Sequence, residues 1–331
     1  MKNVVAIAGI ALLLGACTDL RNPVGTAALP QSTAPVMNVG VEAGASVLLI
    51  HGFDPLNSGH DCESIWSQQR DALRALGHTG RIFTVGYYNA NRNCERNVSS
   101  TVYTKNYAGD WTLVQGTANG RNGILDHNTP IEHAAYRVAW AIAKENTDNG
   151  AASVRAVVHS MGGLVVRYAV QQASMGNSNF PTLAQMNLTR VWTLGTPHLG
   201  TGYANWGTPV QGQQMKPSSG FLSVLNGDQR VGNATWYAFT SLYTFTGDGV
   251  VDSNSACWAR ATWCGRHYGS ISGNGYASRG AYGHGDYMKD PNLYYALANY
   301  DSRSPLNGTN WGARFYDVGA TGMVARNLSR N

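Results

Sequence analysis

The sequence predicts an α/β protein built on a mostly parallel β-sheet that helices cover on both faces. Two observations carry this prediction. Short apolar runs of strand length recur along residues 45–300, and stretches with helical spacing of apolar residues lie between them. Strands and helices that alternate in this way form parallel sheets, because each helix returns the chain to the same end of the sheet. No internal repeat or clear linker interrupts residues 45–300, so we expect one domain there.

The predicted strands are short and rich in Val, Leu, Ile and Phe. They cover residues 46–50, 81–85, 154–158, 190–194 and 239–245. The predicted helices cover residues 63–77, 131–142 and 164–172. In the second helix, apolar residues recur at intervals of three and four and form one face, which identifies the side that packs on the sheet.

The composition excludes several classes of protein. Charged residues make up only 13% of the 331 residues, and the net charge of +5 comes from scattered Lys and Arg. This excludes a disordered chain and a nucleic-acid binder that relies on dense positive charge. The sequence contains no metal-ligand spacing and no glycine-rich phosphate loop, so we expect neither a metal nor a cofactor in the reaction.

The N-terminus reads as an export signal over residues 1–16. Lys2 precedes an apolar run from Val4 to Leu14, and small residues follow. A run of this length is too short to cross a bilayer core of roughly 30 Å as a helix.

The stretch Leu14–Cys17 resembles the bacterial lipobox, although Gly15 departs from the more usual Ala or Ser. The resemblance implies that Cys17 is lipidated, that residues 17–44 are a tether, and that the protein is anchored to the outer membrane. Three prolines and many small residues in the tether agree with a segment that lacks regular structure. The alternative is an ordinary signal peptide and a secreted or periplasmic protein.

Four cysteines remain: Cys62, Cys94, Cys257 and Cys264. An even number in an exported chain predicts two disulfides. We expect the pairs Cys62–Cys94 and Cys257–Cys264, because the members of each pair are close in sequence and lie in loop-like stretches.

Ser160 follows a predicted strand and precedes a predicted helix. A serine on such a sharp turn is exposed at the carboxyl edge of the sheet, and Gly162 and Gly163 let the strand and the helix approach. The stretch Val158–Gly163 resembles the nucleophile elbow of bacterial lipases in the α/β-hydrolase superfamily. It departs from the Gly-x-Ser-x-Gly pattern at the first glycine, where Val158 stands.

The resemblance implies an α/β-hydrolase fold with cap-like insertions and a catalytic acid and histidine after the serine, in that order. Asp248 follows a predicted strand and is the expected acid, with Asp252 as the alternative. A structural ion near these two carboxylates stays open. His284, between glycines, is the expected base in preference to His267, which we place in a disulfide-held loop.

The resemblance also implies two backbone N–H groups that stabilise an oxyanion. Met161 follows the nucleophile, and Phe53 follows the His-Gly pair after the first strand. We expect His51, His159 and His198 to be structural.

These residues predict a serine ester hydrolase that cleaves carboxylic, and specifically lipid, esters through an acyl-serine intermediate. Two insertions, residues 87–127 and 201–238, carry apolar residues that suit a cap over such a substrate; the alternative for 201–238 is a long loop packed on its own domain. An acyltransferase with the same triad and a non-catalytic lipid-binding lipoprotein are the other functions. The sequence assigns no role to the tail 301–331 and no oligomeric state.

Overall fold

We describe a computed structural model of the chain. The residues it describes are 45–75, 78–99, 101–105, 111–115, 124–150, 152–205, 209–228, 230–242, 247–257, 263–268, 283–288, 296–297 and 314–315. The signal peptide, Cys17 and the tether predicted for residues 1–44 lie outside this part of the chain, as does the tail 301–331 except for Arg314 and Phe315.

The described strands form one large sheet and a separate hairpin. The sheet has the order β11-β10-β9-β8-β7-β6-β1-β2-β3. Its strands are β1 (Ser46–Ile50), β2 (Ile82–Gly86), β3 (Arg96–Asn97), β6 (Val154–His159), β7 (Leu188–Leu194), β8 (Thr235–Leu242), β9 (Trp263–Tyr268), β10 (Ala296–Leu297) and β11 (Arg314–Phe315). Neighbours from β9 to β3 pair in parallel, whereas β10 pairs antiparallel with both β9 and β11. The hairpin pairs β4 (Thr101–Lys105) with β5 (Trp111–Gln115).

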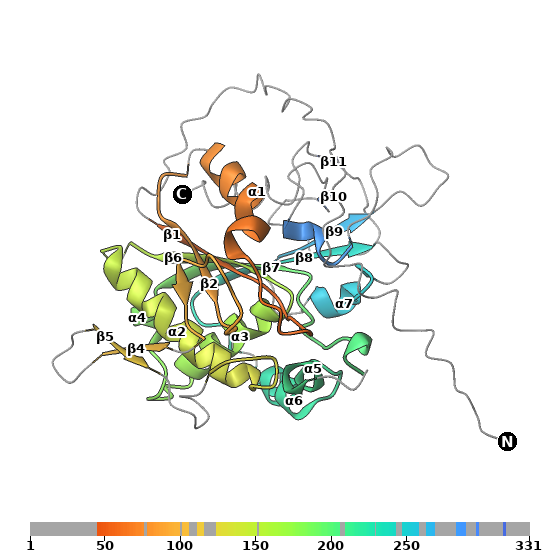
Figure 1. The fold of residues 1–331 in the computed structure, drawn as a ribbon. Helices are drawn as coiled ribbons and strands as arrows, with labels where there is room; N and C mark the ends of the chain where they lie inside the picture. Colours follow the sequence, from red (N-terminus) through yellow and green to blue (C-terminus); the bar gives the residue numbers. More distant parts are fainter. Residues whose placement is uncertain are drawn as a thin grey trace. The chain divides into compact units, whose positions relative to one another are not determined.

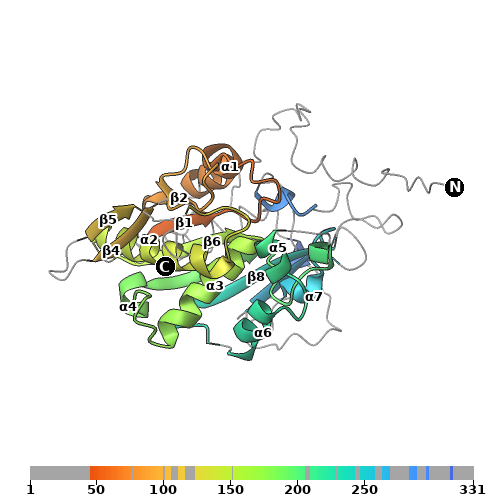
Figure 2. The same ribbon diagram turned by 60° about the horizontal axis from the view of Figure 1, so that its bottom comes forward.

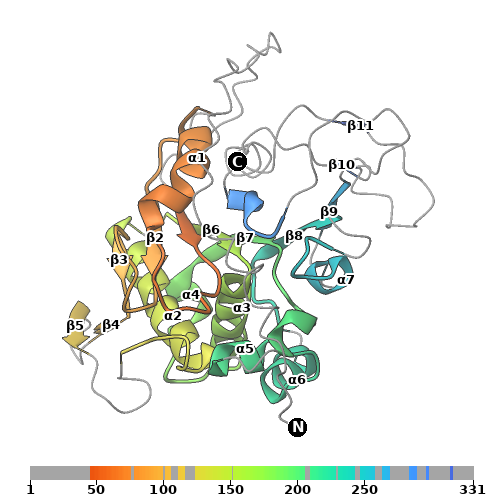
Figure 3. The ribbon, with the colours of Figure 1, turned by 45° about the vertical axis from the view of Figure 1, so that its right-hand side comes forward.

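Helices cover both faces of the sheet (Figure 1). They are α1 (Cys62–Ala75), α2 (Ile131–Asp148), α3 (Met161–Ser174), α4 (Leu183–Met186), α5 (Val210–Gln214), α6 (Gly220–Gly227) and α7 (Ser253–Ala256), with 3₁₀ turns η3 (Gly202–Asn205) and η4 (Asp286–Met288). Buried residues of α2, α3 and α6 share a core with one face of the sheet. Residues of α1 and η4 share a core with the other face, and Figure 3 shows both elements on that side. No helix in the described ranges is both long and apolar enough to span a membrane.

The central strand shows why both faces are covered. All five residues of β1 are buried. Leu48 and Ile50 point into the core with α2 and α3, whereas Val47 and Leu49 point into the core with α1. A continuous apolar run therefore contributes to two cores at once, which confirms the predicted parallel sheet between two helical layers.

The strand order reverses next to β1. The chain runs from β1 outward to β2 and β3, then returns to β6 on the other side of β1 and continues outward through β7, β8 and β9. Connections on the two sides of such a reversal leave in opposite directions, and the ligand sites of open α/β sheets form at this point. The loops that follow these two strands therefore meet at the place where a site is expected.

The two predicted insertions have regular structure of their own. Residues 201–238 contain η3, α5 and α6, and their buried apolar side chains belong to the same core as α3; these are Met215, Phe221, Leu222 and Leu225. This agrees with the alternative of a segment packed on its own domain. Residues 87–127 begin with two fully buried tyrosines, Tyr87 and Tyr88, and continue into the β4–β5 hairpin, which the sequence did not predict.

One expectation about the C-terminal half was wrong. His267 does not lie in a loop: it is part of β9 and pairs with Ser241 of β8. Strand β9 has the sequence WCGRHY and lacks the apolar run that marked the other strands. It lies next to the antiparallel β10, towards one side of the sheet, where continuous apolar residues are not required.

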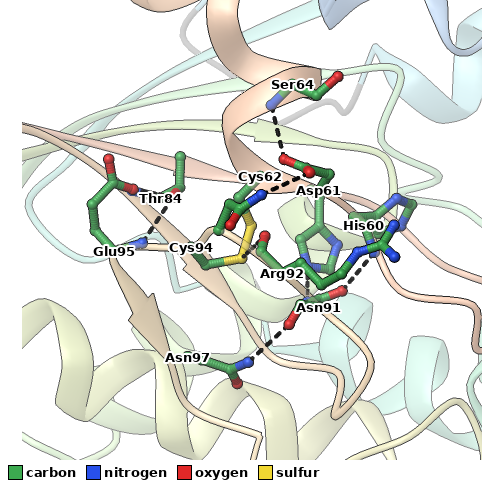
Figure 4. The surroundings of a disulfide bond; sticks show 12 residues. His60, Asp61, Cys62, Ser64, Thr84, Asn91, Arg92, Cys94, Glu95 and Asn97 are labelled. Carbon is green, nitrogen blue, oxygen red and sulfur yellow. Dashed lines mark hydrogen bonds between the residues drawn. A yellow bond between two sulfur atoms is a disulfide. The ribbon is translucent and has the colours of Figure 1, made fainter.

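A disulfide joins Cys62 and Cys94, with 5.0 Å between their Cα atoms (Figure 4). It links the first residue of α1 to the segment between β2 and β3. Two backbone hydrogen bonds run beside it, from Cys62 N to Arg92 O (3.0 Å) and from Arg92 N to His60 O (2.9 Å). Cys257 is also disulfide-bonded. Its pairing with Cys264 stays a prediction, because the side chain of Cys264 lies outside the described part of the chain.

We expect the double substitution Cys62→Ser and Cys94→Ser to lower the free energy of unfolding. The bond closes a loop of 32 residues, and the loss of its constraint on the unfolded chain corresponds to about 3 to 4 kcal/mol. Urea unfolding of the variant and the wild type under oxidising conditions measures the difference and leaves the Cys257 disulfide intact. Equal unfolding midpoints would contradict the expectation.

Candidate active site

Ser160 occupies a sharp turn between β6 and α3. Its backbone has φ 52° and ψ −128°, a conformation that non-glycine residues rarely adopt. The amide N–H of Ser160 donates to Leu194 O (2.8 Å), which ties the turn to the end of β7. The serine is the N-cap residue of α3, so the first amides of the helix lie next to its side chain.

Two glycines make room for this turn. A methyl group on Gly52, in the loop after β1, would lie 2.7 Å from Ser160 Cβ, and one on Gly162 would lie 2.5 Å from His51 O. Neither position can hold a side chain unless the backbone moves. Val158, which departs from the expected glycine pattern, is fully buried in the core with α2 and α3. The close approach therefore depends on glycines at 52 and 162, and the branched side chain at 158 packs on the far side of the strand from α1.

Three of the residues expected at the site are joined by hydrogen bonds. His284 Nε2 lies 2.8 Å from Ser160 Oγ, and His284 Nδ1 lies 2.8 Å from Asp248 Oδ2. Ser160 follows β6, Asp248 follows β8 and His284 follows β9 along the chain. Because β6 to β9 are parallel, all three residues come after carboxyl ends at the same edge of the sheet.

Asp248 is almost completely buried, with 1% of its surface exposed. Its Oδ1 accepts hydrogen bonds from the amides of Val250 (2.9 Å) and Val251 (2.7 Å), and Tyr287 donates its hydroxyl proton to Oδ2 (3.2 Å). Burial alone would raise the pKa of Asp248, but the attraction of His284 and the hydrogen bonds outweigh burial and lower the pKa below its usual value. The carboxylate therefore stays charged, and the hydrogen-bond pattern assigns the His284 proton to Nδ1, which leaves Nε2 as an acceptor.

Tyr287 was missed by the sequence analysis. It is fully buried three residues after His284, and it contacts the carboxylate from the α1 side of the sheet. A tyrosine near a histidine is too common to be a signal in a sequence, and only the 3₁₀ turn η4 directs its hydroxyl at Asp248.

The alternative acid and the neighbouring histidine have structural positions. Asp252 is the N-cap of α7, where its Oδ1 accepts from Asn254 N (2.8 Å). His159 donates from Nε2 to the backbone oxygen of His284 (2.7 Å), and the two ring centroids are 4.8 Å apart. Burial, followed by repulsion from His284, lowers the pKa of His159 to about 3. This imidazole is therefore neutral at ordinary pH, and it supports the backbone of His284.

His198 is also fully buried, with Nε2 3.2 Å from Thr193 Oγ1. Burial and the nearby Arg167 lower its pKa well below the usual value, in agreement with a structural role. Across the described ranges, no three His, Cys, Asp or Glu side chains are grouped in a way that would hold a metal ion.

The two expected oxyanion donors lie on the two segments that meet at Ser160. Met161 is the first residue of α3, and Phe53 directly follows Gly52. In the described part of the chain, the amide N–H groups of Phe53 and Met161 have no hydrogen-bond acceptor. Both donors are therefore available to a ligand.

Part of the chain matches a family model, and the fold is similar to several solved structures. Residues 117–219, which include Ser160, match a family model described as "Putative serine esterase (DUF676)". No curated protein sequence matches the chain. Similar solved structures include a gene lin2722 product from Listeria innocua, with 15% identity, a TM-score of 0.43 and coverage of 75% of this chain and 89% of that one. The mature lipase BlEst2 from Bacillus licheniformis has 16% identity, a TM-score of 0.43 and coverage of 75% and 87%. Lipase B from Aspergillus fumigatus has 13% identity, a TM-score of 0.43 and coverage of 72% and 47%.

The fold is that of the α/β hydrolases. The strand order, the turn at Ser160 and the succession of serine, acid and histidine after β6, β8 and β9 define this class within the chain itself. The serine-esterase family match and the geometry at Ser160 together indicate a serine hydrolase.

Gly195 offers a test of how tightly the site is packed. It follows β7 with φ +57°, and a methyl group there would lie 2.8 Å from Asp248 Oδ2 and 3.3 Å from His284 Nδ1. Gly176 follows the end of α3 with a similar φ of +72°, but a methyl group there would meet no atom within 4 Å.

We expect Gly195→Ala to lower the free energy of unfolding by about 1 to 3 kcal/mol more than Gly176→Ala does. Both substitutions carry the backbone cost of a left-handed conformation, about 1 to 2 kcal/mol, so their difference isolates the crowding around Asp248 and His284. Urea unfolding of the two variants measures it. An equal decrease in the free energy of unfolding of the two variants would show that the space beside Gly195 is not restricted.

Proposed function

We propose that the protein is a serine ester hydrolase that cleaves carboxylic esters, specifically lipid esters, through an acyl-serine intermediate. One observation carries the proposal: a continuous line of hydrogen bonds from the buried Asp248 through His284 to Ser160. A serine hydroxyl becomes an effective nucleophile when a neighbouring base accepts its proton and an acid orients that base.

The first half-reaction transfers the acyl group. His284 Nε2 accepts the proton of Ser160 Oγ while the oxygen attacks the ester carbonyl carbon, which gives a tetrahedral intermediate. Phe53 and Met161 donate their N–H groups to the negative carbonyl oxygen. The intermediate collapses, the bond to the alcohol oxygen breaks, and His284 returns its proton to the leaving alcohol. Asp248 stabilises the positive charge that His284 carries between these steps.

The second half-reaction releases the acid. His284 accepts a proton from a water molecule, whose oxygen attacks the acyl carbon. The second tetrahedral intermediate then expels Ser160 Oγ, which takes back a proton from His284. The carboxylic acid leaves, and the enzyme returns to its starting state. An alcohol in place of water gives acyl transfer by the same steps.

Exposed apolar side chains support a lipid ester as the substrate. Leu56 lies in the loop after β1, Leu199 follows β7, Tyr203 is in η3 and Val210 begins α5. These segments are connected: His127 Nδ1 lies 2.9 Å from Pro55 O, and the amide of Gln211 donates to His127 O (3.2 Å). Figure 2 shows α5 and α6 on the side of the sheet that α3 covers. Leu56 and Leu199 follow the carboxyl ends of parallel strands, at the same edge of the sheet as Ser160. Exposed apolar groups at this edge favour an apolar acyl chain over a charged substrate.

We also propose that the protein is exported and lipid-anchored through Cys17 in the outer membrane. The support is the sequence alone, from the charged and apolar segments of residues 1–16 to the lipobox-like stretch that ends at Cys17. An anchored enzyme would meet lipid substrates at the membrane surface.

We expect Ser160→Ala to abolish ester hydrolysis, with a loss on the order of 10⁴-fold or more in kcat. Wild type and variant are compared on p-nitrophenyl esters with acyl chains from two to sixteen carbons. A preference for long chains supports a lipid ester, and a preference for short chains narrows the function to a carboxylesterase. Products formed with a competing alcohol separate hydrolysis from acyl transfer. Wild-type protein that cleaves none of these esters would contradict the proposed function and favour a lipid-binding role.

The two candidate acids can be separated by matched substitutions. We expect Asp248→Asn to lower kcat by about 10⁴-fold with little change in KM, because the amide cannot hold His284 in the required tautomer. Asp252→Asn should leave kcat within about twofold, since asparagine caps a helix as well as aspartate does. Steady-state kinetics on one ester measures both, and the reverse ranking would assign the acid to Asp252.

A further inference from the structure

The carbonyl oxygen of Gly52 lies within hydrogen-bond distance of two buried side chains. The Tyr87 hydroxyl lies 2.8 Å from Gly52 O and 2.9 Å from His51 O, so its single proton is shared between these carbonyls. His51 Nδ1 lies 2.8 Å from Gly52 O. His51 and Tyr87 are both fully buried, and their rings stack with centroids 4.3 Å apart.

The tautomer of His51 follows from its other neighbour. Asn91 Nδ2 lies 2.6 Å from His51 Nε2, and an amide nitrogen can only donate, so Nε2 accepts and Nδ1 carries the proton. Asn91 is in turn held by the amide of His60, which donates to Asn91 Oδ1 (2.8 Å) beside the Cys62–Cys94 disulfide (Figure 4).

Both side chains keep their donor protons over a wide pH range. Burial, with a smaller contribution from repulsion by His60, lowers the pKa of His51 well below its usual value. Burial raises the pKa of the Tyr87 hydroxyl well above its usual value. A neutral imidazole and a protonated phenol therefore face the Gly52 carbonyl throughout the range of an enzyme assay.

The Gly52 carbonyl belongs to the same peptide group as the Phe53 N–H. In a planar trans peptide these two groups point in opposite directions. Because His51 and Tyr87 hold the Gly52 carbonyl on their side, the Phe53 N–H points away from these two side chains. Gly52 itself packs against Ser160, so this peptide is adjacent to the proposed nucleophile.

We propose that Tyr87, together with His51, is a positioning residue that fixes the Gly52–Phe53 peptide so that its N–H faces the oxyanion. The inference rests on the proposed function. Tyr87 touches neither the substrate nor the reacting atoms: it acts through the peptide that it holds. Without its hydroxyl, the peptide has one donor fewer to oppose rotation, and the Phe53 N–H is a less well-oriented donor to the transition state.

Tyr88 provides a matched control. It is the next residue, is equally buried, and belongs to the same cluster of aromatic rings. Its hydroxyl contacts Gln211 Oε1, interacts with the Tyr87 hydroxyl and accepts from the amide of Asp54 (3.4 Å), and it has no hydrogen bond to Gly52. Tyr88→Phe therefore removes a buried hydroxyl from the same cluster but removes no hydrogen bond to the Gly52 carbonyl.

The experiment compares wild type, Tyr87→Phe and Tyr88→Phe in the full-length protein. Three quantities are measured: kcat and KM for p-nitrophenyl butyrate, the inhibition constant of butylboronic acid, and the urea unfolding midpoint. The boronic acid forms a tetrahedral adduct on a catalytic serine and places an oxygen where the oxyanion would be, so it reports the donors directly.

We expect Tyr87→Phe to lower kcat by roughly tenfold or more with KM nearly unchanged. We expect it to raise the inhibition constant of the boronic acid by a similar factor. Tyr88→Phe should change both values by less than about threefold, even where it destabilises the protein as much as Tyr87→Phe does. Equal kinetic effects in the two variants, or a loss in Tyr87→Phe confined to KM or to the unfolding midpoint, would overturn the positioning role. Wild type without esterase activity or boronic acid inhibition would overturn the proposed function and this inference with it.

Discussion

The close contact between Gly52 and Ser160 is the constraint on which the rest of the site depends. It exists because the strand order reverses between β1 and β6, so that two loops leave neighbouring strands and meet above the sheet. The contact leaves no space for a side chain at Gly52, and it places one donor amide on each side of the serine. Backbone packing therefore sets the positions of the proposed nucleophile and its proposed oxyanion donors, and side chains add the proposed base and acid.

Buried histidines surround the site without adding charge to it. His51 and His159 are neutral because burial opposes protonation, and each uses one ring nitrogen to hold a backbone carbonyl near the proposed triad. A positively charged neighbour would oppose the positive charge that forms on His284 in the proposed reaction. Asp248 is then the charged group in direct contact with His284, and two amides and the Tyr287 hydroxyl stabilise it.

The sequence predicts features that are encoded locally. The apolar run of β1 and the Ser160 turn with Gly162 can be read within a few residues, because burial on two faces and a tight turn each demand particular residue types. The contacts of Tyr87, Tyr287 and His159 cannot be read in this way. Each depends on which backbone carbonyl or carboxylate the fold brings near, across as many as 125 residues for His159 and His284. Strand β9 was missed for a related reason, since its residues carry no apolar run.

The order of the site along the chain has a consequence for the maturation of the protein. The serine turn, its glycines and the oxyanion loop are complete by the end of α3, whereas the base lies 124 residues beyond the serine. A chain that has folded only as far as β8 therefore carries the proposed nucleophile without its proton acceptor. In the proposed mechanism, turnover begins only when the segment that carries His284 packs on the α1 face of the sheet. An incompletely folded chain would therefore not cleave esters.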